Sequence, residues 1–164
     1  MTEDWRKVLW TDESKFNLCI RHVRRPVNAR FNPCYNFGTV KHKGGNIMVW
    51  GSFSLSRIGP LHWIVGIMDH VQYREIMEKV MLPHARQNMP PDWVLQQDND
   101  PKHTAKSVKK WFMDNEMRVM EWLPQSPDHN TIKNLWGEVE RKLKGHKIKK
   151  PDELVKAVNQ EWAA

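Results

Sequence analysis

The sequence predicts an α/β domain in which a mixed sheet is flanked by helices. The first half carries short apolar runs bounded by polar residues, a pattern typical of strands. The second half alternates such runs with stretches whose apolar residues recur at helical spacing. This alternation favours a sheet covered by helices. The 164 residues fit one domain over 1–164, and no repeat or linker divides them.

Four apolar runs in the first half predict strands. These runs lie at 8–10, 16–20, 46–53 and 61–67. We expect the first strand to end at Thr11-Asp12-Glu13 and the second to be its neighbour in the sheet. The stretch 24–43 is rich in Pro, Asn, Arg and Gly, so we expect it to be an irregular excursion.

Helical spacing and turn residues predict the remaining elements. A helix is expected over 71–86, followed by a strand over 93–95 that runs into Gln96-Gln97-Asp98. Asp100-Pro101 supplies an N-cap acceptor followed by proline, so a helix is expected from there to about Asn115. The last elements are a strand over 117–122, a helix after Ser126-Pro127-Asp128 that ends near Leu143, and a helix that opens at Pro151-Asp152.

The charge distribution points to a polyanionic partner. The net charge is +7 with a pI near 9.5, and no Asp or Glu lies between Ser14 and Met68. A second basic cluster runs over 141–150. One interpretation is a solubilising surface; the other is contact with phosphates, where basic side chains displace condensed counterions. Charge alone does not choose between DNA, RNA and a membrane surface.

Composition argues against two other classes of protein. The longest apolar runs, such as 45–53, are interrupted and far shorter than a membrane span, so no membrane partner is expected. Residues 1–20 carry four acids and no apolar block, which argues against a secretory signal. The two cysteines, Cys19 and Cys34, have neither metal-finger spacing nor a disulfide-framework count, so a reduced intracellular compartment is the default.

Two aspartates follow predicted strands. Asp12 comes after Val-Leu-Trp-Thr, and Asp98 comes after Val-Leu-Gln-Gln. Strand ends in α/β architectures present side chains at one rim, where ligands bind. Two carboxylates from adjacent strands can share a pair of magnesium ions, which serve phosphodiester chemistry. Each aspartate taken alone is more simply a turn residue, so spacing supports such a site only weakly.

Several clustered motifs resemble Tc/mariner superfamily transposases, specifically the Tc-one branch. The resemblance covers nearly the whole chain, and the motifs occur in the family's order. They are Val8-Leu-Trp-Thr-Asp-Glu-Ser14, Thr39-Val-Lys-His-Lys-Gly-Gly45, Ile47-Met-Val-Trp-Gly51, Gln96-Gln-Asp-Asn-Asp-Pro-Lys-His-Thr104, and Ser126-Pro-Asp128 followed by Asn134-Leu-Trp136.

This resemblance implies a ribonuclease-H-like catalytic domain for DNA integration and cut-and-paste DNA transposition. In the family, an Asp, Asp, Glu triad binds two magnesium or manganese ions. The motifs carry Asp12 over as the first acid and Asp98 as the second, both as catalytic and metal-binding residues. The family's spacing puts the third acid at position 133, which is Lys133. The resemblance also implies a nuclear location and a homodimer on DNA.

Lys133 leads us to expect reduced or absent strand cleavage and weak metal binding. A protonated lysine donates hydrogen bonds but cannot ligate a hard cation. It also lacks the favourable interaction that a carboxylate has with the positive end of a helix dipole. By helix geometry neither Glu138 nor Glu140 is a convincing replacement, and Asp128 matches a family aspartate outside the triad. One hypothesis is that the Lys133 ammonium sits between Asp12 and Asp98 in place of metal charge.

Basic residues in two places are candidates for DNA contact. In relatives, the region of 24–43 forms an extended loop implicated in contacts with DNA or a partner subunit. A solvated loop is the alternative for Lys41, His42 and Lys43, and a surface histidine in a first helical turn is the alternative for His103. The candidate residues are Arg24, Arg25, Arg30, Lys41, His42, Lys43, Lys102 and His103.

Three functional hypotheses remain at this point. The first is a transposase catalytic domain with a damaged site, and the second is a non-catalytic domain that binds DNA without sequence preference. The third is a decayed relic without a selected role. Family members carry N-terminal helix-turn-helix modules that recognise transposon ends. No candidate recognition helix precedes Asp12, so sequence-specific end binding is not expected from this polypeptide.

Overall fold

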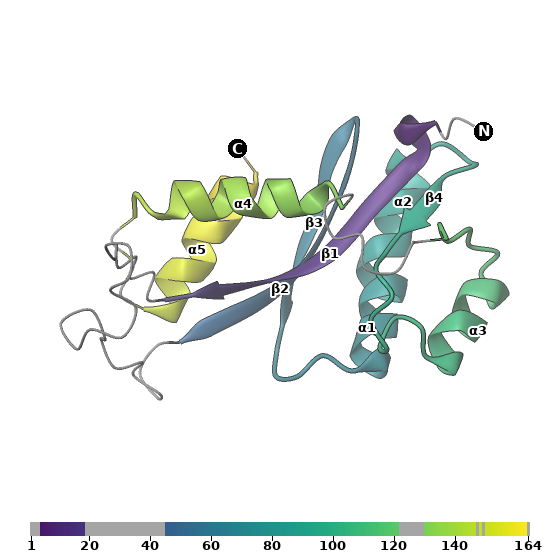
Figure 1. The fold of residues 1–164 in the computed structure, drawn as a ribbon, viewed down its shortest axis with the longest axis horizontal. Coiled ribbons are helices and arrows are strands. Elements are labelled where there is room, and N and C mark those ends of the chain that lie inside the picture. The colour runs from purple at the N-terminus through teal and green to yellow at the C-terminus, as the bar shows by residue number, and fades with distance from the viewer. Residues whose placement is uncertain (1–3, 19–44, 122–129, 147, 149, 164) are drawn as a thin grey trace, which may run out of the picture.

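A mixed sheet with helices against both faces forms the centre of the structure (Figure 1). The structure is a computed structural model that describes residues 4–18, 45–121, 130–146, 148 and 150–163. The four strands lie in the order β3-β2-β1-β4. Their bounds are β1 Val8–Asn17, β2 Asn46–Ser54, β3 Arg57–Ile64 and β4 Val94–Gln96.

The strand β1 is longer than the sequence predicted. Residues 8–10 and 16–17 belong to one strand, so the expected break at Thr11-Asp12-Glu13 is wrong, as is a separate strand that starts at residue 16. Residues 19–20 of that predicted strand lie outside the described residues. The antiparallel ladder with β2 runs without interruption from Trp10 to Asn17, and it satisfies the backbone groups through the polar segment. Asp12 therefore lies within the strand, opposite Gly51 of β2, and not at a strand end.

The edge strand β3 begins four residues earlier than expected. It spans Arg57–Ile64, whereas the apolar pattern predicted 61–67. It pairs antiparallel with β2 alone, so the missing N–H of Pro60 can face the open side of the edge without breaking the ladder. On the opposite side of the sheet, β4 pairs parallel with the start of β1 through Val8, Leu9 and Trp10.

The predicted helix over 71–86 is observed as three consecutive helical segments. They are α1 (His70–Ile76), a π-helical stretch η3 (Met77–Met81) and α2 (Leu82–Asn88). The Asp69 carboxylate starts the helix by accepting hydrogen bonds from the backbone N–H groups of Val71 and Gln72. Pro83 lacks the N–H that a regular helix would donate, which accounts for the irregular stretch just before it.

The segment after β4 differs from the sequence prediction. Residues 100–104 form a turn, and helix α3 (Lys106–Asp114) starts at Lys106, not at Asp100-Pro101. The carboxylates of Asp98 and Asp100 accept the backbone N–H groups of Asp100 and Lys102. These local bonds compete with helix formation. The expected strand over 117–122 is reduced, in the described part, to one parallel bridge between Leu95 and Val119.

Two helices cover the face of the sheet opposite to α1, α2 and α3. Both match their predicted positions. They are α4 (Ile132–Leu143) and α5 (Pro151–Trp162). A short 3-10 helix η1 (Trp5–Lys7) precedes β1. No helix in the described ranges is both long and apolar enough to cross a membrane.

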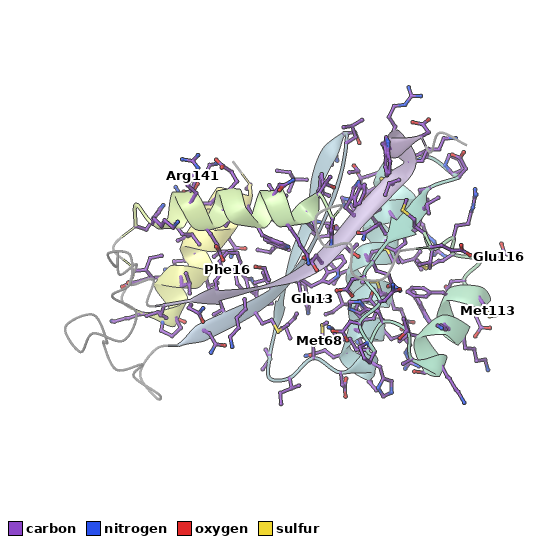
Figure 2. All side chains as sticks on the ribbon, in the orientation of Figure 1. Glu13, Phe16, Met68, Met113, Glu116 and Arg141 are labelled. Carbon is purple, nitrogen blue, oxygen red and sulfur yellow. The ribbon has the colours of Figure 1, made fainter. Side chains whose placement is uncertain are left out.

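Alternation along the strands divides the apolar residues between two cores. Leu9 and Trp50 pack with α1, α2 and α3, whereas Val8 and Phe16 pack with α4 and α5. Because successive strand residues point to opposite faces, adjacent positions serve different helices. Figure 2 shows Phe16 on the α4 side of β1 and Met68 beside α1, in agreement with the two clusters.

Gly51 permits the close packing of α4 and α5 on the sheet. A Cβ atom at this position would lie 2.6 Å from Cη2 of Trp136 and 2.9 Å from Cη2 of Trp162. The two indole rings stack with centroids 4.5 Å apart, and the Trp162 N–H donates to the Gly59 carbonyl at 2.9 Å. Any side chain at Gly51 would therefore displace this pair.

We predict that Gly51→Ala lowers the free energy of unfolding by about 1–3 kcal/mol, the usual effect of overpacking a dense core. Denaturant titration followed by tryptophan fluorescence measures this change. Gly137→Ala is the matched control, because a Cβ at Gly137 meets no atom within 4 Å and the residue lies inside α4. That variant should gain about 0.5–1 kcal/mol from helix propensity. Equal effects of the two substitutions would contradict the packing argument.

Candidate functional site

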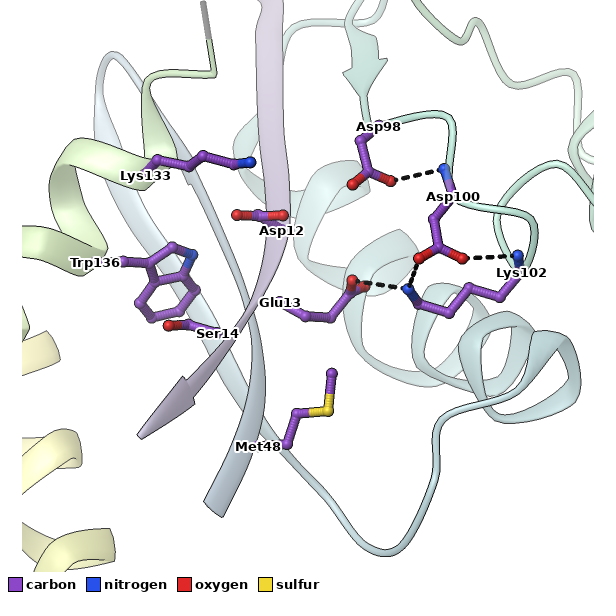
Figure 3. A pocket seen from close by; sticks show the side chains of 9 residues that line it. All are labelled: Asp12, Glu13, Ser14, Met48, Asp98, Asp100, Lys102, Lys133 and Trp136. Carbon is purple, nitrogen blue, oxygen red and sulfur yellow. Dashed lines mark hydrogen bonds and ion pairs between the residues drawn. The ribbon is translucent and has the colours of Figure 1, made fainter. Parts of the chain in front are cut away.

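A polar pocket opens where β1, the end of β4 and the start of α4 meet (Figure 3). Four carboxylates and two lysines face it, together with a few neutral side chains. The residues that line the pocket are Asp12, Glu13, Ser14, Met48, Asp98, Asp100, Lys102, Lys133 and Trp136. The structure thus brings together Asp12, Asp98 and position 133, the three positions that the sequence resemblance had assigned to a triad.

Asp12 is a buried carboxyl on the α4 side of β1. Asp12 is only 8 % exposed. Burial, as the largest cause, and the neighbouring Glu13 and Asp98 carboxylates together raise the pKa of Asp12 to about 6, while the Lys133 ammonium opposes them. Lys133 thus acts on the charge of Asp12 through space, without an ion pair between the two side chains among the described residues.

Lys133 lies in the first turn of α4 and extends over the pocket. Its backbone N–H donates to the Asn130 carbonyl at 3.0 Å. Figure 3 shows its side chain reaching towards the space between Asp12 and Asp98. The ion pairs found among the described residues do not include Lys133. The direction of the Lys133 side chain thus agrees with the hypothesis of a tethered cation between the two aspartates. Among the described ion pairs, however, Lys133 forms no direct salt bridge with either aspartate.

Asp98 follows β4 and is held by two donors. Its Oδ1 accepts the His103 Nδ1–H at 2.6 Å and the backbone N–H of Asp100 at 3.0 Å. The hydrogen bond from His103 is the main reason that the pKa of Asp98 falls to about 2, although partial burial opposes it. Asp98 is therefore a permanent anion at the rim of the pocket.

His103 is buried between two carboxylates. Its side chain is 2 % exposed, and its Nε2 lies 3.1 Å from Oε1 of Glu13. Its ring lies against Tyr73 with centroids 4.1 Å apart. Burial alone would lower the pKa of His103, but the hydrogen bonds to Asp98 and Glu13 outweigh it and raise the pKa to about 9. This position does not fit the alternative of a surface histidine, and it leaves the ring no free nitrogen for DNA.

Glu13 and Tyr73 are site residues that sequence analysis did not identify. Both Glu13 oxygens are engaged, Oε1 with His103 and Oε2 with Lys102 Nζ at 3.4 Å. Lys102 Nζ also contacts Asp100 at 2.6 Å, so this lysine is tied into the pocket and only 16 % exposed. The Tyr73 hydroxyl donates to Gln97. Glu13 adjoins Asp12 in sequence, but its role arises from a contact 90 residues away.

The other candidate DNA contacts lie outside the described residues. Six of the eight basic candidates fall in the segment between β1 and β2, and the structure describes none of them. These six are Arg24, Arg25, Arg30, Lys41, His42 and Lys43. Asp128 also lies outside the described residues.

The donor set in the pocket does not fit a pair of divalent cations. Hard cations need several oxygen ligands, and an ammonium supplies none. Glu13 has both oxygens engaged by His103 and Lys102, and Asp98 has one oxygen engaged. In the parts of the chain that the structure describes, no group of three or more His, Cys, Asp or Glu side chains is arranged to hold a metal ion. Asp12 and the second oxygen of Asp98 remain as ligands.

We predict that the free energy of unfolding falls as pH rises from 6.5 to about 9. The folded pKa of His103 is raised from 6.5 to about 9, so its contribution is complete below pH 6.5 and is lost as pH passes the folded value. The loss is on the order of 3 kcal/mol for a shift of this size. Urea titrations at pH 6, 7.5 and 9 measure it. His103→Phe, which keeps a ring against Tyr73, should flatten the dependence, and an unchanged slope would contradict the assignment.

The chain matches a family model described as DDE superfamily endonuclease over residues 7–155. It is 45 % identical over 163 residues to the transposable element Tcb1 transposase of Caenorhabditis briggsae, with 97 % of this chain and 60 % of the relative covered. Identity to the Tc1 transposase of Caenorhabditis elegans is also 45 %, over 166 residues and 61 % of that protein. The chain thus spans about 60 % of the length of these curated relatives.

Solved structures of Mos1 transposase share the fold. The paired-end complex of Mos1 with the left transposon end superposes with a TM-score of 0.80 at 14 % identity, covering 99 % of this chain and 49 % of that one. The catalytic domain of Mos1 mariner transposase superposes with a TM-score of 0.68 at 14 % identity, covering 99 % and 72 %. This likeness confirms the expected ribonuclease-H-like fold. The family match and the identity to the Tcb1 and Tc1 transposases show that the chain belongs to the Tc1/mariner transposases of the DDE superfamily.

Proposed function

We propose that this chain is a transposase catalytic domain that binds DNA but is impaired in strand cleavage by Lys133. The observation that carries the proposal is the Lys133 ammonium, which reaches into the pocket that holds Asp12 and Asp98. In the family a carboxylate at this position completes a set of oxygen ligands. Here it is replaced by a cation, so metal ions would be repelled from the place where they are needed.

Asp12 and Asp98 come from neighbouring strands and would supply two of the ligands of such a set. Asp12 lies on the central strand, and Asp98 lies beyond the end of the adjacent parallel strand. The catalytic domain of Mos1 transposase has been solved with Mn and with Mg. We therefore propose magnesium or manganese as the ions that this pocket would bind if position 133 supplied a carboxylate.

DNA binding is the activity that Lys133 leaves intact. The chain carries a net charge of +7, and the basic residues Arg141, Lys142, Lys144 and Lys150 lie at the end of α4 and the start of α5. Mos1 transposase has been solved in a paired-end complex with the left transposon end. These observations support a chain that binds DNA through its phosphates, as a homodimer on DNA. A nuclear location is part of the proposal and follows from the family resemblance alone.

We predict that Lys133→Glu gains metal binding. Calorimetry with Mn²⁺ and Mg²⁺ should give no measurable heat for the unaltered chain and a saturable isotherm for the glutamate variant. Lys133→Gln is the matched control, because it removes the cation without adding a carboxylate, and it should stay far weaker than Lys133→Glu. Nicking of supercoiled plasmid by the three proteins gives the chemical readout. Tight metal binding by the unaltered chain would overturn the impairment.

We also predict salt-sensitive binding to duplexes of unrelated sequence. Fluorescence anisotropy between 50 and 200 mM salt should show a steep loss of affinity, roughly a thousandfold for an interface with about six phosphate contacts. Replacing Arg141 and Lys142 by Gln should weaken binding equally for all sequences and reduce the salt slope. Absence of binding at low salt would favour a decayed relic over a DNA-binding domain.

A further inference from the structure

We propose that His103 is a positioning residue that fixes the Asp98 carboxylate, so that one oxygen is held by the protein and the other faces Asp12 and Lys133. The inference rests on the proposed role of Asp98 as a ligand in the transposase pocket. It adds a residue to which neither the sequence motifs nor the family match assigned such a role. His103 does not face the pocket itself, since it is absent from the lining residues.

The Asp98 carboxylate is divided between two environments. Oδ1 accepts both His103 Nδ1–H, at 2.6 Å, and the backbone N–H of Asp100, at 3.0 Å. Figure 3 shows the second oxygen turned to the opposite side, towards Lys133 and Asp12. Two donors on one oxygen fix the rotation of the carboxylate, so its other oxygen has one direction in which to bind a ligand.

The other ring nitrogen of His103 is held just as firmly. Nε2–H donates to Oε1 of Glu13 at 3.1 Å, and the second oxygen of Glu13 contacts Lys102. Glu13 is on β1, the strand next to β4, so the chain of contacts runs from Asp98 through His103 to the central strand. An ionised carboxylate only accepts hydrogen bonds, so the geometry requires a proton on each ring nitrogen.

Tyr73 sets the plane of the imidazole. The two rings lie 4.1 Å apart between centroids, and Tyr73 is fully buried, with its hydroxyl bonded to Gln97. A histidine held by two hydrogen bonds and by an aromatic face has no rotational freedom. The His103 ring therefore fixes the orientation of the Asp98 carboxylate. Residues that hydrogen-bond to metal ligands orient those ligands in the same way in other proteins.

This arrangement places Asp98 without help from a metal ion. The Glu13, Asp98 and Asp100 carboxylates all find cationic partners in His103 and Lys102. The pocket thus keeps Asp98, one of the three triad positions, fixed although Lys133 occupies another. Lys133→Glu would supply the missing carboxylate.

Asparagine and glutamine at position 103 separate positioning from mere packing. The side-chain nitrogen of Asn stands as many bonds from Cα as Nδ1 of histidine, and that of Gln as many as Nε2. His103→Asn therefore retains the donor to Asp98, whereas His103→Gln retains only the donor to Glu13. The backbone N–H of Asp100 reports on Asp98, because it shares Oδ1.

Hydrogen exchange of the Asp100 amide, measured by NMR in the unaltered Lys133 background without metal or DNA, tests the proposal. His103→Gln should speed this exchange by roughly tenfold, the effect of losing one hydrogen bond, and His103→Asn should stay close to the unaltered chain. The Leu95 amide, bonded to the Arg118 carbonyl, is the internal control for global stability. Equal exchange in the two variants would overturn the proposal. If a variant does not fold, ¹⁵N NMR of the unaltered chain decides: a protonated Nδ1 supports the bond to Asp98, and an unprotonated one excludes it.

A second measurement connects His103 to ligand binding. In the Lys133→Glu background, His103→Gln should weaken Mn²⁺ binding about 10- to 100-fold, as loss of an orienting partner does elsewhere, and His103→Asn should weaken it less. Equal affinities of the two double variants would count against positioning. Absence of Mn²⁺ binding by Lys133→Glu itself would instead contradict the proposed function, and the exchange measurement would still decide the role of His103.

Discussion

The alternation of side chains along β1 is the constraint on which both the cores and the pocket depend. This strand is paired on both edges, antiparallel with β2 and parallel with β4, so its backbone cannot rotate or slip. Val8 and Phe16 consequently enter one core and Leu9 enters the other. The same alternation sends Asp12 towards α4 and the adjacent Glu13 towards His103 and Lys102. Two neighbouring acids thus acquire different partners because they lie on opposite faces of one strand.

Electrostatic balance explains how so many acids share a small space. Glu13, Asp98 and Asp100 are paired with Lys102 and His103, and these pairs hold the pKa of Asp98 low and that of His103 high. Asp12 has no such partner within the described ion pairs, and burial raises its pKa. Two carboxylates in one pocket therefore have opposite tendencies to ionise. Lys133 acts on Asp12 at longer range and reduces this difference.

The family relationship connects this balance of charges to a functional site. A ribonuclease-H-like fold, a DDE family match and relatives at 45 % identity place the chain among transposases, and the pocket lies where the resemblance had put the triad. Around Asp98, the described structure supplies hydrogen bonds from His103 and from the backbone N–H of Asp100. Among the three positions that the resemblance assigned to acids, Lys133 at the start of α4 is the one that carries no carboxylate. Lys133 is exposed and packs into neither core, so the two cores do not depend on the residue at this position.

The sequence by itself determined the class of fold and the two terminal helices, and it selected Asp12, Asp98 and Lys133 as candidate site residues, which line one pocket. These follow from local periodicity and from motifs, which are properties of short segments. Only the tertiary structure decided that β1 continues through Asp12, because the ladder with β2 outweighs the local polarity of Thr11-Asp12-Glu13. It also decided that residues 100–104 form a turn and that His103 is buried between Asp98 and Glu13. Such contacts join residues that are far apart in the sequence, so local sequence patterns do not predict them.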